Sequence, residues 1–356
     1  MTSESFNRIA NGVRTFDKYS TEINTTHQTE TETHFDIGEI RMNSKNALLF
    51  IHAQTSLHPG TGAALGTVDM PIQRERHTGW PMIAGSSIKG VIREHCRPDS
   101  DEKFEKDKWC DVFGAESGTN DPQAGAISFT DARILAFPVR SARGVFAWVT
   151  CKDVLDRLGR DAMLATVPFT WQLTGGLEEG SAVASSPALE IAGEKKLLLE
   201  EYDFNVSTSK EYDEAVQDVA KWLADNATND EFTRERLKTH LVVVPDAEFT
   251  HFVRHATEVT ARIGLDYKTK TVTGGALFYE EFLPPETLMY SVVVANKGRR
   301  AKGKVESSAS EILKFVTDKL PPNSILQIGA NETIGKGLCA ISLASSTTPA
   351  FAELRS

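Results

Sequence analysis

The sequence lacks long hydrophobic runs, although its 356 residues are 40% hydrophobic. A transmembrane helix needs about 18 or more consecutive apolar residues, and no stretch of the chain approaches that length. The N-terminus is polar and has no hydrophobic region of the kind found in secretory signal peptides. We therefore expect a protein without membrane-spanning helices and a cytoplasmic location.

The sequence is also poor in cysteine. Its four cysteines are Cys96, Cys110, Cys151 and Cys339. They are far apart and form no CxxC pair, which argues against a zinc site and a disulfide framework. We expect reduced, mostly buried thiols. His251 and His255 are four residues apart on an expected helix, but no acid completes an HExxH arrangement, so we interpret them as structural.

The sequence has no excess of basic residues, and its formal net charge is −10. This balance argues against indiscriminate nucleic-acid binding over the whole surface, although it leaves room for a local basic groove. The composition is that of an ordinary globular protein, and the length suffices for a sizeable core in one or two domains. No internal repeat of fixed period is visible.

The hydrophobic patterns predict an α+β protein rather than a doubly wound sheet, because strands and helices do not alternate regularly. Residues 1–45 are polar and predict a flexible N-terminal extension. A strand is expected over residues 47–57, at the start of a domain that spans residues 46–346 and contains a helical insertion. The order of elements fits split βαβ units, as in ferredoxin-like or RRM-type domains. Residues 347–356 form a short C-terminal tail.

The segment that begins at His58, HPGTGAALGTVDMP, is a glycine-rich loop with a single acid. That acid is Asp69, and a basic run with Arg74 and Arg76 follows it. A carboxylate in such a loop can accept a proton or contribute an oxygen ligand to Mg²⁺. By residue type alone, a turn residue is the more common role for an aspartate, and a packing role the more common one for a lone histidine.

The stretch IAGSSIKGVIRE predicts a helix with Gly85 or Ser86 as its N-cap. Lys89 and Arg93 are four residues apart and share one side of this helix. The free backbone N–H groups of the first turn favour an anion, so the helix start is a candidate site for a phosphate. An ordinary amphipathic helix with a solvated face is the alternative.

The glycine loop IGANETIGKG resembles a P-loop superficially, but its spacing argues against an NTPase. Five residues separate Gly329 from Gly335, and Gly337 follows Lys336 where Ser or Thr is required. The loop is also expected to join two strands. Glycine N–H groups together with Thr333 and Lys336 still suit a phosphate backbone, and a tight connection between strands is the alternative.

Residues 258–284 predict a β-hairpin around the turn DYKTK. Lys268 and Lys270 in this turn are candidates for RNA contact, and an apolar neighbour is a candidate for insertion between bases. A plain surface hairpin is the alternative.

A second basic segment, KGRRAKGK, covers residues 297–304 and includes Arg299 and Arg300. Five of its eight residues are basic within an acidic chain. This density favours RNA contact, with a solvated loop as the alternative.

Three motifs in this order resemble the RAMP superfamily of CRISPR effector proteins, and within it the backbone subunits of type III-B (Cmr) complexes. They are the GTVDMPIQRE loop with its SSIKG helix, the RIGLDYKTKTVTGGALFYEE hairpin and the GANETIGKG loop. The resemblance covers roughly residues 47–345. It implies subunits that stack as a filament along a guide RNA, each with a ferredoxin-like palm, a helical insertion and a thumb hairpin that displaces guide bases.

The resemblance further implies that complementary target RNA is cleaved at regular intervals by a loop acid, which here is Asp69, with a divalent metal such as Mg²⁺ or Mn²⁺. His58 is the second catalytic candidate. The implied partners are guide RNA, target RNA, copies of the chain itself and other effector subunits, with no membrane. The RNA-binding candidates are Arg74, Ser86, Lys89, Arg93, Lys268, Lys270, Arg299, Arg300, Thr333, Gly335, Lys336 and Gly337.

Two other functions remain open at this point. A non-catalytic RNA-binding scaffold, with another subunit cutting, is the second possibility, since one acid is a thin catalytic signature. A nuclease that processes guide precursors is the third possibility, although such enzymes usually depend on a His or Tyr base.

Overall fold

The computed structural model describes residues 44–99, 102–116, 118, 123–173, 175–191, 193–299, 307–322 and 324–345. The chain divides into two units, Met1–Glu39 and Ile40–Ser356, and the first lies entirely outside the described residues. The expected N-terminal extension, apart from Ser44 and Lys45, and the expected C-terminal tail also lie outside them.

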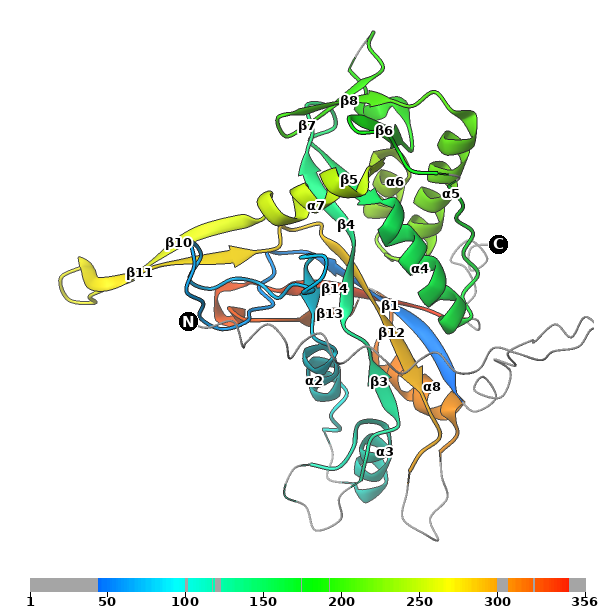
Figure 1. Cartoon of the computed structure of the whole chain (residues 1–356). Helices are drawn as coiled ribbons and strands as arrows, with labels where there is room; N and C mark the ends of the chain where they lie inside the picture. The colour runs from blue at the N-terminus through cyan, green and yellow to red at the C-terminus, as the bar shows by residue number, and fades with distance from the viewer. Residues whose placement is uncertain are drawn as a thin grey trace, which may run out of the picture. The chain divides into compact units, whose positions relative to one another are not determined.

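A mixed sheet of twelve strands is the framework of the described residues (Figure 1). The strand order is β13-β14-β1-β12-β4-β5-β9-β6-β8-β7, with β2 paired to β4 and β3 paired to β12. The strands of this sheet are β1 Lys45–Ala53, β2 Met82–Ile83, β3 Ile127–Phe129, β4 Ala132–Arg140, β5 Phe146–Cys151, β6 Ser181–Ala184, β7 Lys196–Leu199, β8 Tyr202–Val206, β9 Leu241–Val244, β12 Leu288–Ala295, β13 Ser324–Gln327 and β14 Leu338–Ala344.

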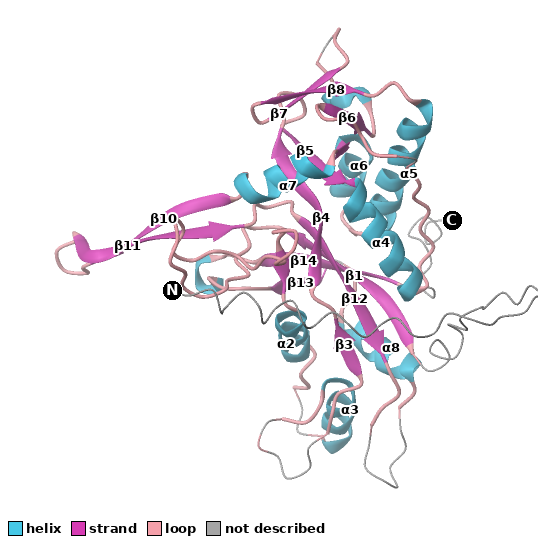
Figure 2. Ribbon diagram, in the orientation of Figure 1, coloured by secondary structure: helices cyan, strands magenta, loops and turns pink. Residues whose placement is uncertain are grey.

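Helices flank this sheet and confirm the α+β class (Figure 2). They are α2 Gly85–His95, α3 Lys103–Phe113, α4 Lys152–Ala165, α5 Lys210–Asn226, α6 Glu231–His240, α7 Asp246–His255 and α8 Ala309–Lys319, with short 3₁₀ turns at Pro187–Leu189 and Glu332–Ile334. Of the helices within the described ranges, none is long and apolar enough to cross a membrane.

The strand β1 lies inside the sheet, where it pairs antiparallel with β12 and with β14. Its run of large apolar residues suits this position, because Leu48, Leu49, Phe50 and Ile51 are all fully buried. The predicted strand over residues 47–57 is confirmed in part. It ends at Ala53, because the next residues turn away and their N–H groups donate to the Leu338 carbonyl.

The predicted hairpin is confirmed by β10 Glu258–Leu265 and β11 Val272–Phe282, which form a separate two-stranded sheet. The hairpin extends away from the twelve-stranded sheet (Figure 1). Val259, Ile263, Leu265 and Leu277 on it are each more than half exposed. An apolar surface of this kind on a projecting element is typical of an interaction site.

Candidate functional site

The Asp69 loop and the glycine loop both contact the last residues of β11, 279–282. Asp69 Oδ2 accepts a hydrogen bond from the Tyr279 N–H at 2.7 Å. The Met70 N–H donates to the Tyr279 carbonyl at 3.0 Å, and the Glu281 N–H donates to the Met70 carbonyl at 3.0 Å. Residues 69–70 therefore lie beside β11 like a short added strand. Asp69 is half-buried, and within the described part of the chain its Oδ1 accepts no hydrogen bond.

His58 lies at the same place, but its ring is buried. Its Nδ1 is 2.6 Å from the Glu281 carbonyl oxygen, which can only accept, so Nδ1 carries a proton. Its Nε2 is 3.7 Å from Glu280 Oε1, and the ring centroid is 5.5 Å from that of Phe282. These contacts give His58 a packing and positioning role. Its catalytic role stays a prediction.

Glu280 is a buried acid of this site that sequence reasoning missed. Its Oε2 accepts from Arg262 at 2.9 Å, and its Oε1 accepts from the side-chain amide of Asn331 in the glycine loop. A buried carboxylate is costly unless it is paired, so these contacts join the hairpin to the glycine loop. The available signal was an acid pair, EE, at the end of an otherwise apolar strand.

The neighbouring buried acid, Glu281, pairs with Arg74. The Arg74 guanidinium donates to Glu281 Oε1 at 2.5 Å and to the carbonyls of Gly79 at 2.9 Å and Val253 at 2.8 Å. Glu281 Oε1 also accepts from the Thr257 hydroxyl at 2.9 Å. Within the described residues these contacts of Arg74 are internal, and its contact with RNA stays a prediction.

Two glycines of the glycine loop are required by close backbone approach. A Cβ atom on Gly337, where φ is +75°, would lie 2.1 Å from the Ile328 carbonyl oxygen. One on Gly329, where φ is +83°, would lie 2.4 Å from the carbonyl oxygen of His58. The Ala330 N–H donates to that same carbonyl at 3.0 Å. The loop joins β13 to β14 as predicted, and Gly337 is needed for packing.

The remaining candidates of the glycine loop differ in exposure. Thr333 and Gly335 are exposed, so their surface is open to a phosphate. Lys336 Nζ donates to Ser56 Oγ at 3.1 Å and lies 4.9 Å from the centroid of the Phe282 ring. The ammonium group is therefore held over the base of the hairpin, beside the buried acids.

At the start of α2, the predicted cap is wrong. The N-cap residue is Ala84, not Gly85 or Ser86, and it provides no side-chain cap. Instead the Gly85 N–H donates to Asp131 Oδ1 at 2.8 Å. A Cβ atom on Gly85 would lie 2.3 Å from the Phe129 carbonyl oxygen, so glycine is needed where the helix meets this segment. Ser86 is exposed in the first turn.

The two basic residues of α2 are partly engaged within the chain. Lys89 Nζ donates to the Ile127 carbonyl at 3.1 Å, and burial together with the nearby charge of Arg93 lowers the pKa of Lys89. The Arg93 guanidinium lies 4.4 Å from the centroid of the Trp109 ring. Gly90, between them, faces open space, because a Cβ atom there would meet nothing within 4 Å.

The hairpin tip carries two exposed lysines, Lys268 and Lys270. Asp266 Oδ1 accepts from the backbone N–H groups of Lys268 and Thr269, and Lys270 Nζ lies 4.2 Å from the centroid of the Tyr267 ring. These local contacts order the turn and leave both ammonium groups at the surface.

The other basic segment is only partly described. Arg299 is exposed, and Arg300 lies outside the described residues. The structure thus brings Asp69, His58 and the glycine loop together at one end of β11. It leaves the hairpin tip, α2 and Arg299 as separate candidate RNA contacts.

The candidate metal site consists of Asp69 alone. Within the described ranges, no group of three or more His, Cys, Asp or Glu side chains could hold a metal ion. A Mg²⁺ ion in proteins often keeps several waters and binds one or two carboxylates together with substrate phosphates. Asp69 fits only a site of that kind, to which RNA would contribute ligands.

Comparison with known proteins identifies the family. Residues 50–340 match the family model described as the RAMP superfamily. The chain belongs to the RAMP superfamily. The resemblance inferred from the three motifs is therefore confirmed, and the residues matched in this RAMP protein include His58, Asp69, the hairpin and the glycine loop.

Relatives of this RAMP protein carry related names. The chain is 39% identical over 299 residues to the "CRISPR system Cmr endoribonuclease Cmr4" of Pyrococcus furiosus, covering 84% of this chain and 96% of that one. It is 26% identical over 304 residues to the "CRISPR system CMR subunit Cmr4" of Saccharolobus solfataricus, covering 81% and 93%. Among solved structures, oligomeric Cmr4 from Pyrococcus furiosus is similar, with a TM-score of 0.64, 32% identity and coverage of 85% and 99%.

Proposed function

We propose that this chain is a backbone subunit of a type III-B CRISPR effector complex that binds guide RNA and cleaves complementary target RNA at regular intervals. The observation that carries the proposal is the meeting of Asp69 with the projecting hairpin at Tyr279. The name of the Pyrococcus furiosus relative, an endoribonuclease, supports the same reaction class.

In this proposal the strands β14, β1, β12 and β4 form a ferredoxin-like palm. These four are neighbours in the sheet in that order, with α2 between β1 and β4 in the chain and α8 between β12 and β14. The hairpin β10–β11 is the thumb, and α5, α6 and α7 are the helical insertion. Copies of the chain form a filament with guide RNA and other subunits, a proposal supported by the oligomeric relative.

Asp69 acts on the target RNA through its Oδ1, which is not used inside the described structure. The carboxylate accepts the proton of a ribose 2′-hydroxyl, whose oxygen then attacks the adjacent phosphorus. The bond from phosphorus to the 5′-oxygen breaks and this oxygen takes a proton from water, which leaves a cyclic 2′,3′-phosphate and a 5′-hydroxyl. Most of the rate comes from holding the attacking oxygen in line with the leaving oxygen.

A divalent metal, Mg²⁺ or Mn²⁺, is part of the proposal. Asp69 would supply one oxygen ligand, and the ion would neutralise charge on the phosphate. EDTA is expected to stop cleavage without releasing guide RNA, and added Mg²⁺ is expected to restore it. Undiminished cleavage in EDTA would remove the metal from the proposal.

RNA binding is assigned to the exposed candidates. Guide phosphates are proposed to contact the first turn of α2 and the surface of the glycine loop at Thr333 and Gly335. The exposed amines at the hairpin tip and the guanidinium of Arg299 extend this basic surface, because phosphate contacts dominate the affinity of such interfaces.

The deciding experiment uses the assembled complex with guide RNA and an end-labelled complementary target. The wild type is expected to give evenly spaced products, and Asp69→Asn is expected to bind the target without cleaving it. Asp218→Asn, which alters an exposed acid on α5, is the matched control and keeps full cleavage. Normal cleavage by Asp69→Asn would contradict the catalytic role of Asp69 and favour a non-catalytic scaffold.

A further inference from the structure

Arg74 and Glu75 are consecutive residues whose side chains are held by different parts of the fold. The Glu75 N–H donates to the Trp80 carbonyl, and the Gly79 N–H donates to the Glu75 carbonyl, both at 2.8 Å. Residues 74 and 75 enter this turn, where Arg74 forms an isolated antiparallel bridge with Pro81. Successive side chains of an extended backbone point to opposite sides.

Arg74 holds the loop to the base of the hairpin. Its partner Glu281 is two residues beyond Tyr279, which donates its N–H to Asp69. Asp69 and Arg74 therefore attach the loop to β11 on either side of residues 70–73, and Met70 pairs with β11 between them. These attachments fix the loop relative to the hairpin, and the hydrogen bond from Arg74 to the Val253 carbonyl also holds it to α7.

Glu75 holds the same loop to α4. Its Oε2 accepts from Arg157 at 3.0 Å and from the Thr78 hydroxyl at 2.8 Å, and its Oε1 accepts a second hydrogen bond from Arg157. The side chains of Glu75 and Arg157 are only 11% and 16% exposed. A bidentate pair with this burial fixes orientation as well as distance.

The helix α4, which carries Arg157, is itself anchored to the sheet. Arg133 of β4 donates to Asp161 of α4 at 2.5 Å, and the Tyr290 hydroxyl of β12 donates to the same oxygen at 2.9 Å. Arg133 also lies 4.0 Å from Glu75. The chain of contacts thus runs from the loop through α4 to two strands of the sheet.

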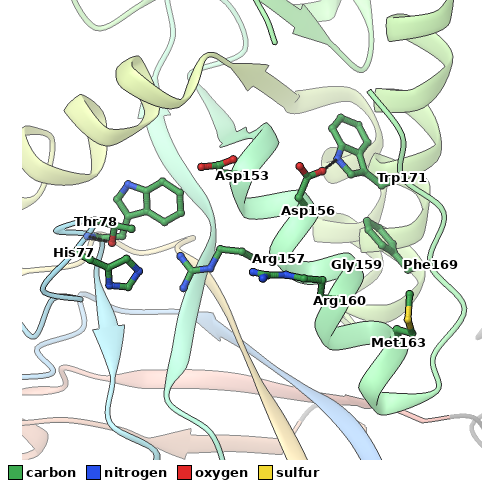
Figure 3. A pocket seen from close by; sticks show the side chains of 11 residues that line it. His77, Thr78, Asp153, Asp156, Arg157, Gly159, Arg160, Met163, Phe169 and Trp171 are labelled. Atoms are coloured by element: carbon green, nitrogen blue, oxygen red, sulfur yellow. Dashed lines mark hydrogen bonds between the residues drawn. The ribbon is translucent and has the colours of Figure 1, made fainter. Parts of the chain in front are cut away.

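Figure 3 shows the α4 side of this arrangement. Arg157 projects from α4 toward the segment that carries His77 and Thr78, whereas Asp156 turns to the Trp171 indole. These residues line a cavity of about 700 Å³. Arg157 thus holds the loop to α4 from the edge of this cavity.

We propose that Arg74 and Glu75 are positioning residues for the cleavage reaction. They hold the Asp69 loop between the hairpin and α4, so that RNA carried by the hairpin meets the carboxylate in one fixed geometry. This inference rests on the proposed function. Neither residue touches the reacting atoms, and both act through the placement of Asp69.

The test compares Glu75→Gln and Arg157→Gln with the wild type in the assembled, guide-loaded complex. Single-turnover cleavage is measured over a range of target concentrations. Each variant is expected to slow the rate at saturating target by about 10-fold to 100-fold, because misplacement of about 1 Å can have that effect. The half-saturating target concentration and the product positions are expected to stay unchanged.

Three further variants make the result decisive. The double variant is expected to be no slower than the slower single one, because both changes break the same contact. Asp225→Asn removes a comparable half-buried pair with Arg234, at 2.8 Å between α5 and α6, and is expected to lower thermal stability without slowing cleavage. Should Glu75→Gln fail to assemble, Arg157→Lys keeps the charge but loses the bidentate geometry and is expected to be slow too.

Failure of this inference is distinguishable from failure of the proposed function. If Asp69→Asn cleaves normally, the proposed function is wrong, and the positioning role falls with it. If Asp69→Asn is inactive while Glu75→Gln, or Arg157→Lys in its place, cleaves at the wild-type rate, the positioning role alone is overturned. Equal slowing by Asp225→Asn would also overturn it, because the effect would then be general destabilisation.

Discussion

The Asp69 carboxylate accepts a hydrogen bond from the Tyr279 N–H, with Oδ2 and N 2.7 Å apart. One oxygen thus anchors the loop, while within the described residues the other accepts no hydrogen bond. Asparagine can still accept this hydrogen bond, whereas alanine cannot. We predict that Asp69→Ala lowers the free energy of unfolding by about 1 kcal/mol more than Asp69→Asn. Urea denaturation measures the difference, and equal stabilities would show that the anchor is unimportant.

The lysines of the hairpin tip are predicted to contribute affinity through phosphate contacts. For single-stranded RNA, each lost contact reduces the slope of log affinity against log salt by about 0.7. Changing Lys268 and Lys270 to Gln is expected to flatten this slope while stability changes by less than about 0.5 kcal/mol. Binding titrations at several salt concentrations measure the slope, and Lys210→Gln, which changes an exposed lysine, is the control. An unchanged slope would place the tip away from RNA.

Glu75 is predicted to contribute to acid sensitivity. Burial raises the pKa of the Glu75 carboxyl, but the hydrogen bonds from Arg157 and Thr78 together lower it by more. The pKa therefore lies below the ordinary 4.5. A carboxyl with a depressed folded-state pKa stabilises the fold above its unfolded-state value and loses that contribution as pH falls through the folded-state pKa. Unfolding free energy is therefore expected to decline below pH 4.5, less steeply in Glu75→Gln. Identical pH profiles would contradict this.

Gly337 is predicted to be intolerant of a side chain. Its φ of +75° and the 2.1 Å approach to the Ile328 carbonyl oxygen both oppose a Cβ atom. Gly337→Ala is expected to lower the free energy of unfolding by about 2 kcal/mol or more. Gly90→Ala, in open space on α2, is the control and is expected to be neutral or stabilising by up to about 1 kcal/mol. Similar losses in both would refute the packing argument.

The thiols are predicted to react slowly in the folded protein. Burial raises the pKa of Cys96 to about 11 and that of Cys339 to about 12, and it raises that of Cys151 well above its ordinary value. Because the thiolate is the reactive form, maleimide labelling at about pH 8 should be slow until denaturant is added. Cys110 is only half-buried and should label first. Rapid labelling of Cys339 would reveal local opening near β14.

Local patterns in the sequence were sufficient for much of the fold. The alternation in β10 and β11 and the turn between them predicted the hairpin, and the glycine spacing predicted a connection between strands. The cap of α2 was missed, because the Gly85 N–H donates to Asp131, which lies 46 residues further along the chain. No pattern within one segment contains that pairing.

The site was predicted by residue type and family likeness more than by geometry. Asp69 and His58 were singled out in one loop, and the structure brings both to β11. The buried acids Glu280 and Glu281 went unnoticed, since their partners come from segments far along the chain. The same limitation made Arg74 look like a free surface cation. Where a charge finds its partner in space is decided only when the chain has folded.

The glycine loop also has a consequence for synthesis of the protein. The Ala330 N–H donates to the His58 carbonyl, and the Gly337 N–H donates to that of Ser56. These contacts, with the pairing of β1 to β14, join the beginning of the described fold to its end. A growing chain must extend through β14 before residues 56–58 and β1 have these partners. Nascent chains that stop before the glycine loop are therefore expected to lack the assembled site and to show no RNA cleavage.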